Sequence, residues 1–184
     1  LDGLKQVMDE WLSEHPKVER ETQQEIIKLN TFARGNYQAI DIELAIPKDQ
    51  EAGRMDIIAV RREEKRFVPV IVELKHGIDA FDGKSGIRNH YDNIIRFLNR
   101  EGCEEYLIET IRRIWDAKRT LGLLKEPVPD AAAFDRAELL FAVTGWLTGN
   151  TDDIRKRLPE TLSRTVRVAV SPTKELYFDN GVSL

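Results

Sequence analysis

The sequence predicts an α/β fold in which α-helices flank a mixed central β-sheet, and three observations lead to that prediction. The chain has 184 residues, enough for one domain and too short for two of ordinary size. Hydrophobic residues make up 41% of it and charged residues 33%, so it can bury a core and lacks the composition of a disordered chain. Segments with helical apolar spacing alternate with Val- and Ile-rich runs, in the order helix, three strands, helices, strand, helix, strands.

Two helices are expected before the first strand. Leu4–Leu12 follows the i, i+3, i+4 spacing of a short amphipathic helix that stops before Pro16. A second helix starts there, since proline suits a first turn, and Gly35 is a natural cap at its end. The apolar stripe of this second helix consists of Val18, Thr22, Ile26, Leu29, Phe32 and Ala33.

Three strands are expected next. Tyr37–Ile46 alternates strictly, which places Ile40, Ile42, Leu44 and Ile46 on one face. Arg54–Arg61 and Phe67–Lys75 are rich in Val and Ile, as buried strands are.

The second half of the chain continues the alternation of helices and strands. Its expected elements are a loop at His76–Gly83, helices at about Ile87–Leu98 and Glu104–Leu121, a connector marked by Pro127 and Pro129, a strand at Glu138–Trp146, a helix from about Asn150, and a closing hairpin of Val166–Val170 and Leu176–Phe178 around Pro172. The whole of residues 1–184 is therefore expected to be one domain, with a core at about 18–146 and a C-terminal helix and hairpin at 150–184.

Composition also limits the kinds of protein this can be. The net charge of −4 excludes attachment to nucleic acid by bulk positive charge, although not by a local basic face. No apolar run reaches the roughly 18 residues of a membrane-spanning helix, and no secretory signal begins the chain, so no membrane is expected. Cys103 is the single cysteine, which fits a reducing, cytoplasmic compartment. A start at Leu1 is compatible with a piece of a longer chain or complex.

Two carboxylates and one ammonium group are expected at the end of the second and third strands. Asp56 opens the second strand, whereas Glu73 and Lys75 end the third. Side chains alternate along a strand, so Glu73 and Lys75 project from the same face, and hairpin pairing would bring Asp56 beside them. An ordinary ion pair at a strand end is the simpler interpretation of these three charges. The β-branched flanks and the Gly-Arg-x-Asp approach favour a functional one.

Phosphodiester hydrolysis needs this set of side chains. Mg²⁺ stabilises a multiply negative transition state and prefers a few carboxylate oxygens, with water and phosphate in its remaining positions. Asp56 and Glu73 would hold the ion, and Lys75 would orient or deprotonate the attacking water.

With these residues the sequence resembles the PD-(D/E)xK nuclease superfamily, which has the restriction-endonuclease-like fold. The family signature is an Asp at the start of one core strand and (Asp/Glu)-x-Lys at the end of the next, matched here by Asp56 and Glu73-Leu74-Lys75. Met55 replaces the Pro of the family name, a change that many members share. The family core of helix, three strands, helix and strand matches the order expected over residues 18–146.

The resemblance implies a metal-dependent endonuclease that acts on DNA. Asp56 and Glu73 would bind Mg²⁺, for which Mn²⁺ is a substitute, the Leu74 carbonyl would complete the site, and Lys75 would serve the nucleophile. Many members act as dimers, so a homodimer is compatible with the resemblance.

Further polar residues are candidates for the same site. Glu43 lies on the polar face of the first strand, within reach of the metal, and Glu25 falls inside the apolar stripe of its helix, where many family members carry an acid. Asn89 and His90 occupy the following helix, where relatives often have a substrate-positioning Gln, and a solvated helix face is the simpler interpretation of both. His76 directly follows the motif and is expected at the mouth of the site.

Three alternatives remain at this point. The loop before the third helix contains Gly83-Lys84-Ser85, the end of a P-loop, but Ile78 stands where the first glycine belongs and Asp79 and Asp82 disfavour phosphate. The chain can also be a catalytically inactive member of the fold that binds nucleic acid or a protein. A third possibility is an interaction module with basic helix faces, in which the trio is a plain ion pair; those faces would consist of Arg112, Arg113, Lys118, Arg119, Arg155, Lys156 and Arg157.

Overall fold

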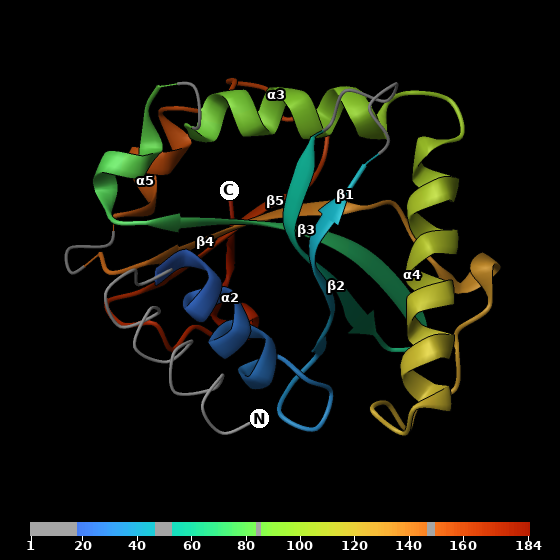
Figure 1. The fold of residues 1–184 in the computed structure, drawn as a ribbon. Helices are drawn as coiled ribbons and strands as arrows, with labels where there is room; N and C mark the ends of the chain where they lie inside the picture. The colour runs from blue at the N-terminus through green and yellow to red at the C-terminus, as the bar shows by residue number, and fades with distance from the viewer. Residues whose placement is uncertain (1–17, 47–52, 84–85, 147–149) are drawn as a thin grey trace, which may run out of the picture.

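The computed structural model describes residues 18–46, 53–83, 86–146 and 150–184, and it shows an α/β fold built on one mixed sheet (Figure 1). Its helices are α2 (Val18–Leu29), α3 (Ile87–Leu98), α4 (Cys103–Thr120) and α5 (Thr151–Arg155), and its strands are β1 (Tyr37–Ala45), β2 (Arg54–Glu63), β3 (Arg66–His76), β4 (Glu138–Thr144), β5 (Val166–Ser171) and β6 (Val182–Ser183). Short 3₁₀ turns lie at Ile78–Phe81, Ala131–Ala133 and Phe178–Asn180. The expected helix at Leu4–Leu12 lies outside the described residues.

The six strands follow one another across the sheet in chain order. β1, β2 and β3 form an antiparallel meander, β4 and β5 run parallel to β3, and β6 returns antiparallel to β5. Parallel neighbours need a crossover, and α3 and α4 supply it between β3 and β4. The predicted α/β class with a mixed central sheet is therefore confirmed.

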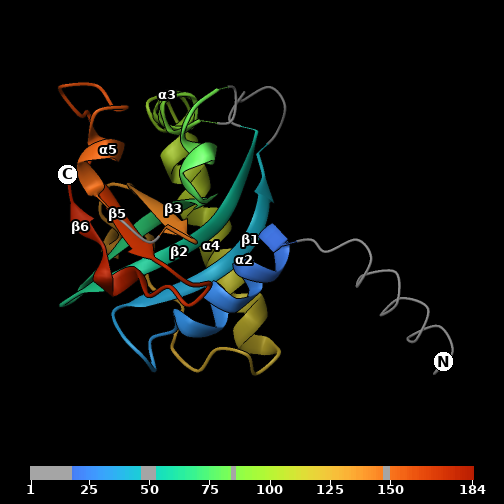
Figure 2. The ribbon, with the colours of Figure 1, turned by 90° about the vertical axis from the view of Figure 1, so that its left-hand side faces the viewer.

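Each face of the sheet carries its own apolar cluster. One cluster joins alternate residues of the strands to α3 and α4, including Tyr91, Ile94 and Trp115. Helix α2, blue in Figures 1 and 2, contributes Ile26 to the other cluster. The C-terminal segment contributes Leu176 and Phe178 to it. The central strands are buried on both faces, which is why their middle residues form nearly continuous apolar runs.

The predicted extension of the second helix to Gly35 is wrong, because α2 ends at Leu29. The next residue, Asn30, is buried, lies after the end of the helix and links it to the C-terminal segment. Its Nδ2 donates to the carbonyls of Ile26 and Leu176, and its Oδ1 accepts the Phe178 N–H. These bonds to the distant C-terminal segment replace continued helix.

Strict alternation along the first strand is also wrong. A β-bulge lies between Ala39 and Asp41 and interrupts the alternation of β1. Ile40, Leu44 and Ile46 lie with the cluster on the α3 side, as expected, whereas Ile42 packs against the cluster on the α2 side.

The closing hairpin forms with a different second strand from the predicted Leu176–Phe178. Leu176 and Phe178 are buried in the α2-side cluster, and the strand that pairs with β5 is Val182–Ser183. The predicted strand Glu138–Trp146 likewise ends early, at Thr144, because Gly145 adopts a positive φ of 70°. A side chain at Gly145 would collide with the His76 ring, since an added Cβ lies 2.7 Å from its Cε1.

Candidate functional site

The pairing of β2 with β3 places Asp56 beside the (Asp/Glu)-x-Lys segment. The regular ladder between these strands ends at Ile57 opposite Val72. Beyond that pair, the Leu74 N–H donates to a side chain instead of a backbone carbonyl. Its acceptor is Asp56 Oδ2, at 2.8 Å. Asp56 is thus fixed to the strand that carries the other two charged residues.

Glu73 and Lys75 form a buried ion pair. Lys75 Nζ lies 2.9 Å from Glu73 Oε1, and the two residues are 6% and 2% exposed. They project from β3 toward the α3 side, because their neighbours Val72 and Leu74 belong to the cluster on the opposite face. An exposed ion pair loses little hydration when it forms. Burying two charges, in contrast, costs several kcal/mol of desolvation free energy for each ion. The pair therefore carries a desolvation cost that an exposed charge contact at a strand end would not.

A third group reaches the same carboxylate from α3. His90 Nδ1 lies 2.7 Å from Glu73 Oε1 and its side chain is 29% exposed. A carboxylate only accepts, so Nδ1 carries the proton of this hydrogen bond. Glu73 Oε1 therefore receives two donors, whereas Glu73 Oε2 is buried without a hydrogen-bond partner among the described residues.

The surroundings keep Glu73 ionised. Burial is the largest influence and by itself raises the pKa of this carboxyl. The hydrogen bond from His90 and the charge of Lys75 together outweigh burial and hold the pKa of Glu73 below its ordinary value. A buried, anionic carboxylate with one unsatisfied oxygen is thus present at neutral pH.

These residues fit a hydrated Mg²⁺ ion better than a closed metal site. Within the described residues no group of three or more His, Cys, Asp or Glu side chains is arranged to hold a metal. Mg²⁺ is commonly held by one or two carboxylates and keeps several waters, so Asp56 and Glu73 suffice. The unsatisfied, buried Glu73 Oε2 is the observation that supports this fit.

Glu43 lies opposite Asp56 in the sheet, between the pairs Ile42–Ile57 and Leu44–Met55. It adopts a left-handed φ of 52°, which is rare for a residue with a side chain. Its Oε2 forms ion pairs with Arg20 of α2 at 2.9 Å and with Arg54 of β2 at 3.4 Å. The structure therefore brings Glu43 to the right level of the sheet, but in contact with two arginines that the sequence did not connect with it.

The remaining candidates lie farther from the carboxylate pair. Glu25 is partly exposed and pairs with Lys28 at 3.4 Å, so its ion pair is within α2 itself and not with Glu73. Asn89 Nδ2 donates to the Gly83 carbonyl and stabilises the start of α3. His76 bonds through Nδ1 to the Thr144 hydroxyl at 3.1 Å and faces away from Glu73, on the α2 side of the sheet.

The P-loop alternative depends on residues that are only partly described. Lys84 and Ser85 lie outside the described residues. The preceding loop contains the turn Ile78–Phe81, and Asp82 pairs with Arg157 through both oxygens, at 2.8 and 2.9 Å. The hydrogen bond from Arg157 holds the pKa of the Asp82 carboxyl below its ordinary value, because it outweighs the opposing effect of burial.

The basic residues of α4 and α5 are mostly engaged locally. Arg112 pairs with Glu109, Lys156 with Asp153, and Arg157 with Asp82. These contacts favour solvated helix faces over a continuous basic surface for DNA.

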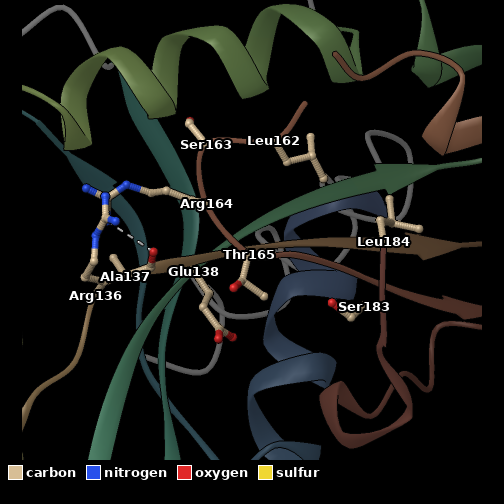
Figure 3. A pocket seen from close by; sticks show the side chains of 9 residues that line it. All are labelled: Arg136, Ala137, Glu138, Leu162, Ser163, Arg164, Thr165, Ser183 and Leu184. Atoms are coloured by element: carbon tan, nitrogen blue, oxygen red, sulfur yellow. Dashed lines mark hydrogen bonds between the residues drawn. The ribbon is translucent and has the colours of Figure 1, made fainter. Parts of the chain in front are cut away.

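A separate cavity of about 450 Å³ lies at the other end of β4 (Figure 3). It is lined from the starts of β4 and β5 and from β6, by residues that include Glu138, Thr165 and Ser183. Arg164 borders it and forms a buried ion pair with Glu104 at 2.7 Å. Glu73 and Lys75 do not line this cavity.

No protein-family model, curated protein or solved structure matches the chain. Among the helices that the structure describes, none is long and apolar enough to cross a membrane.

Proposed function

We propose that the chain is a Mg²⁺-dependent nuclease that hydrolyses DNA phosphodiester bonds at the end of β2 and β3. The observation that carries the proposal is the buried Glu73–Lys75 pair, fixed beside Asp56, with Glu73 Oε2 left unsatisfied. Burying two charges repays its desolvation cost only when further hydrogen bonds satisfy the remaining lone pairs, and Glu73 Oε2 has no such bond among the described residues. An unfilled carboxylate oxygen next to a buried lysine is better explained by a ligand that binds there.

The order of the elements supports the same proposal. The helix α2, the three strands β1–β3, a helical crossover and the strand β4 come in the order that a restriction-endonuclease-like core would have, and this order supports the proposal. One departure is that the crossover contains two helices, α3 and α4, where that core has one.

Each of the three residues has a distinct task in this reaction. Asp56 and Glu73 would hold the metal ion, whose chemistry when bound is to lower the pKa of water and to stabilise charge on the phosphate. Lys75 positions the attacking water and balances the negative charge of the phosphate, since its ammonium group carries three donors. Burial of Lys75 at 6% exposure keeps bulk water from competing for those donors.

A cleavage assay tests the proposal. The purified chain is incubated with supercoiled, linear, single-stranded and branched DNA in Mg²⁺, in Mn²⁺ and in EDTA. We expect cleavage in either metal, none in EDTA, and none by Asp56→Ala or Lys75→Ala. Arg96→Ala, which changes an exposed cation of α3, is the matched control and should cut like the wild type.

The alternative function is a catalytically inactive binder of nucleic acid. A folded chain that cuts no substrate in either metal, yet binds DNA with an affinity that falls as salt rises, would establish that alternative.

A further inference from the structure

We propose that His90 is a positioning residue of the metal site: together with Lys75 it holds Glu73 Oε1, so that Oε2 is the oxygen presented to the metal ion. This inference rests on the proposed function. From its place on the helix after the motif, His90 would be expected to contact the phosphate. The role proposed here is a different one, because His90 would act on Glu73.

The packing of α3 determines where the imidazole lies. Ile87, Tyr91 and Ile94 of α3 are buried in the cluster that covers this face of the sheet. His90 lies one helical turn from Ile87 and Ile94, at the edge of that buried face. Because the helix is fixed by these apolar contacts, the 2.7 Å bond between His90 and Glu73 joins two rigid elements.

The two carboxylate oxygens of Glu73 differ in their hydrogen bonds. Oε1 accepts from Lys75 at 2.9 Å and from His90 at 2.7 Å, although either donor alone would satisfy it. Oε2 is buried and lacks a partner among the described residues. A buried acceptor without a donor is destabilising, and more so when it is charged. Two donors on one oxygen fix the rotation of the carboxylate and so fix the direction of the other oxygen.

His90 also makes Lys75 available for the reaction. When the Lys75 ammonium turns to the attacking water, Glu73 still receives the His90 hydrogen bond. Without His90, that movement would leave a carboxylate of 2% exposure with no donor among the described residues, which is costly. Histidine donors to ligating carboxylates act in this supporting way, and their loss typically weakens metal affinity by about 10–100-fold.

Mn²⁺ binding, measured by titration calorimetry on the full chain without DNA, tests the inference. We expect His90→Ala to bind Mn²⁺ about 10–100-fold more weakly than the wild type. His90→Asn should bind within about tenfold of the wild type, because the asparagine amide places a donor close to the position of Nδ1. Arg96→Ala, on the same helix and exposed, should bind like the wild type. Thermal unfolding establishes that each variant is folded.

The outcomes separate this inference from the proposed function. Wild-type affinity in His90→Ala, with DNA cleavage intact in the wild type, would overturn the positioning role alone. A wild-type chain that neither binds Mn²⁺ nor cuts DNA would overturn both. If His90→Ala does not fold, His90→Gln replaces it, and affinity equal to that of His90→Asn would contradict the placement of the donor at Nδ1.

Discussion

Replacing Lys75 by methionine tests why the buried pair exists. The change removes an ammonium group that lies 2.9 Å from Glu73 Oε1 and replaces the aliphatic part of the side chain by an unbranched apolar chain of similar length. Loss of one partner of a buried pair costs about 3–5 kcal/mol. His90 continues to donate to Glu73, so we expect the lower end, and a loss of about 3 kcal/mol lowers Tm by roughly 6–12 °C in a domain of this size.

The double variant Glu73→Met with Lys75→Met gives the decisive comparison. Replacing both charges by apolar side chains removes the desolvation cost along with the attraction, and such changes are often neutral or stabilising by about 1–4 kcal/mol. A pair that is retained for its chemistry predicts a double variant at least as stable as the wild type and inactive on DNA.

Thermal and denaturant unfolding measure the difference in stability between the variants and the wild type. Arg88→Met, which breaks the exposed pair with Asp92, is the control and should change stability by no more than about 1 kcal/mol. A double variant less stable than Lys75→Met would refute the reasoning and make the pair a structural one.

Two further predictions concern groups away from the site. Burial raises the pKa of Glu104, but the hydrogen bond from Arg164 outweighs it, so the pKa lies below its ordinary value. The lowered pKa of Glu104 contributes stability that is present above the unfolded pKa of about 4.3 and is lost as the pH falls through the folded pKa. We therefore expect Glu104→Gln to flatten the acid side of a Tm–pH curve. At neutral pH the same variant should lose about 3 kcal/mol, because it leaves the 4%-exposed Arg164 side chain without its anion. A curve unchanged by the variant would contradict this linkage. Burial is also the main cause that raises the pKa of Tyr37 to about 12, so native stability is complete below about pH 10 and declines as the pH rises toward that value. Absorbance titration of tyrosinate should show a late component that Tyr37→Phe removes, and its persistence in the variant would refute the assignment.

The central strands and their charged ends could be predicted because their signals are local. β2 and β3 are continuous Val and Ile runs, and the two-residue repeat of a strand places Glu73 and Lys75 on one face without any knowledge of the fold. Antiparallel pairing of neighbouring strands then brings Asp56 to the Leu74 N–H.

The contacts that complete the site depend on packing between distant segments. The sequence names His90 as a candidate, but its contact with Glu73 follows from how α3 lies across the sheet. The bulge in β1 accompanies the packing of Ile42 on the α2 side, while Ile40, Leu44 and Ile46 pack on the α3 side, and no residue type near Ile40 signals it. Leu176 and Phe178 alternate like a strand, yet they bury their side chains beneath α2 because Asn30 binds the backbone there.

The rate at which the wild type and Lys75→Ala nick supercoiled DNA in Mg²⁺, measured side by side, tests the central claim most directly. Both chains are first shown to be folded, and an EDTA sample of the wild type defines the background. The proposed site predicts cleavage by the wild type, a rate at background in Lys75→Ala, and full activity in Arg96→Ala. Equal cleavage by the wild type and Lys75→Ala would show that the end of β2 and β3 is not where the reaction occurs.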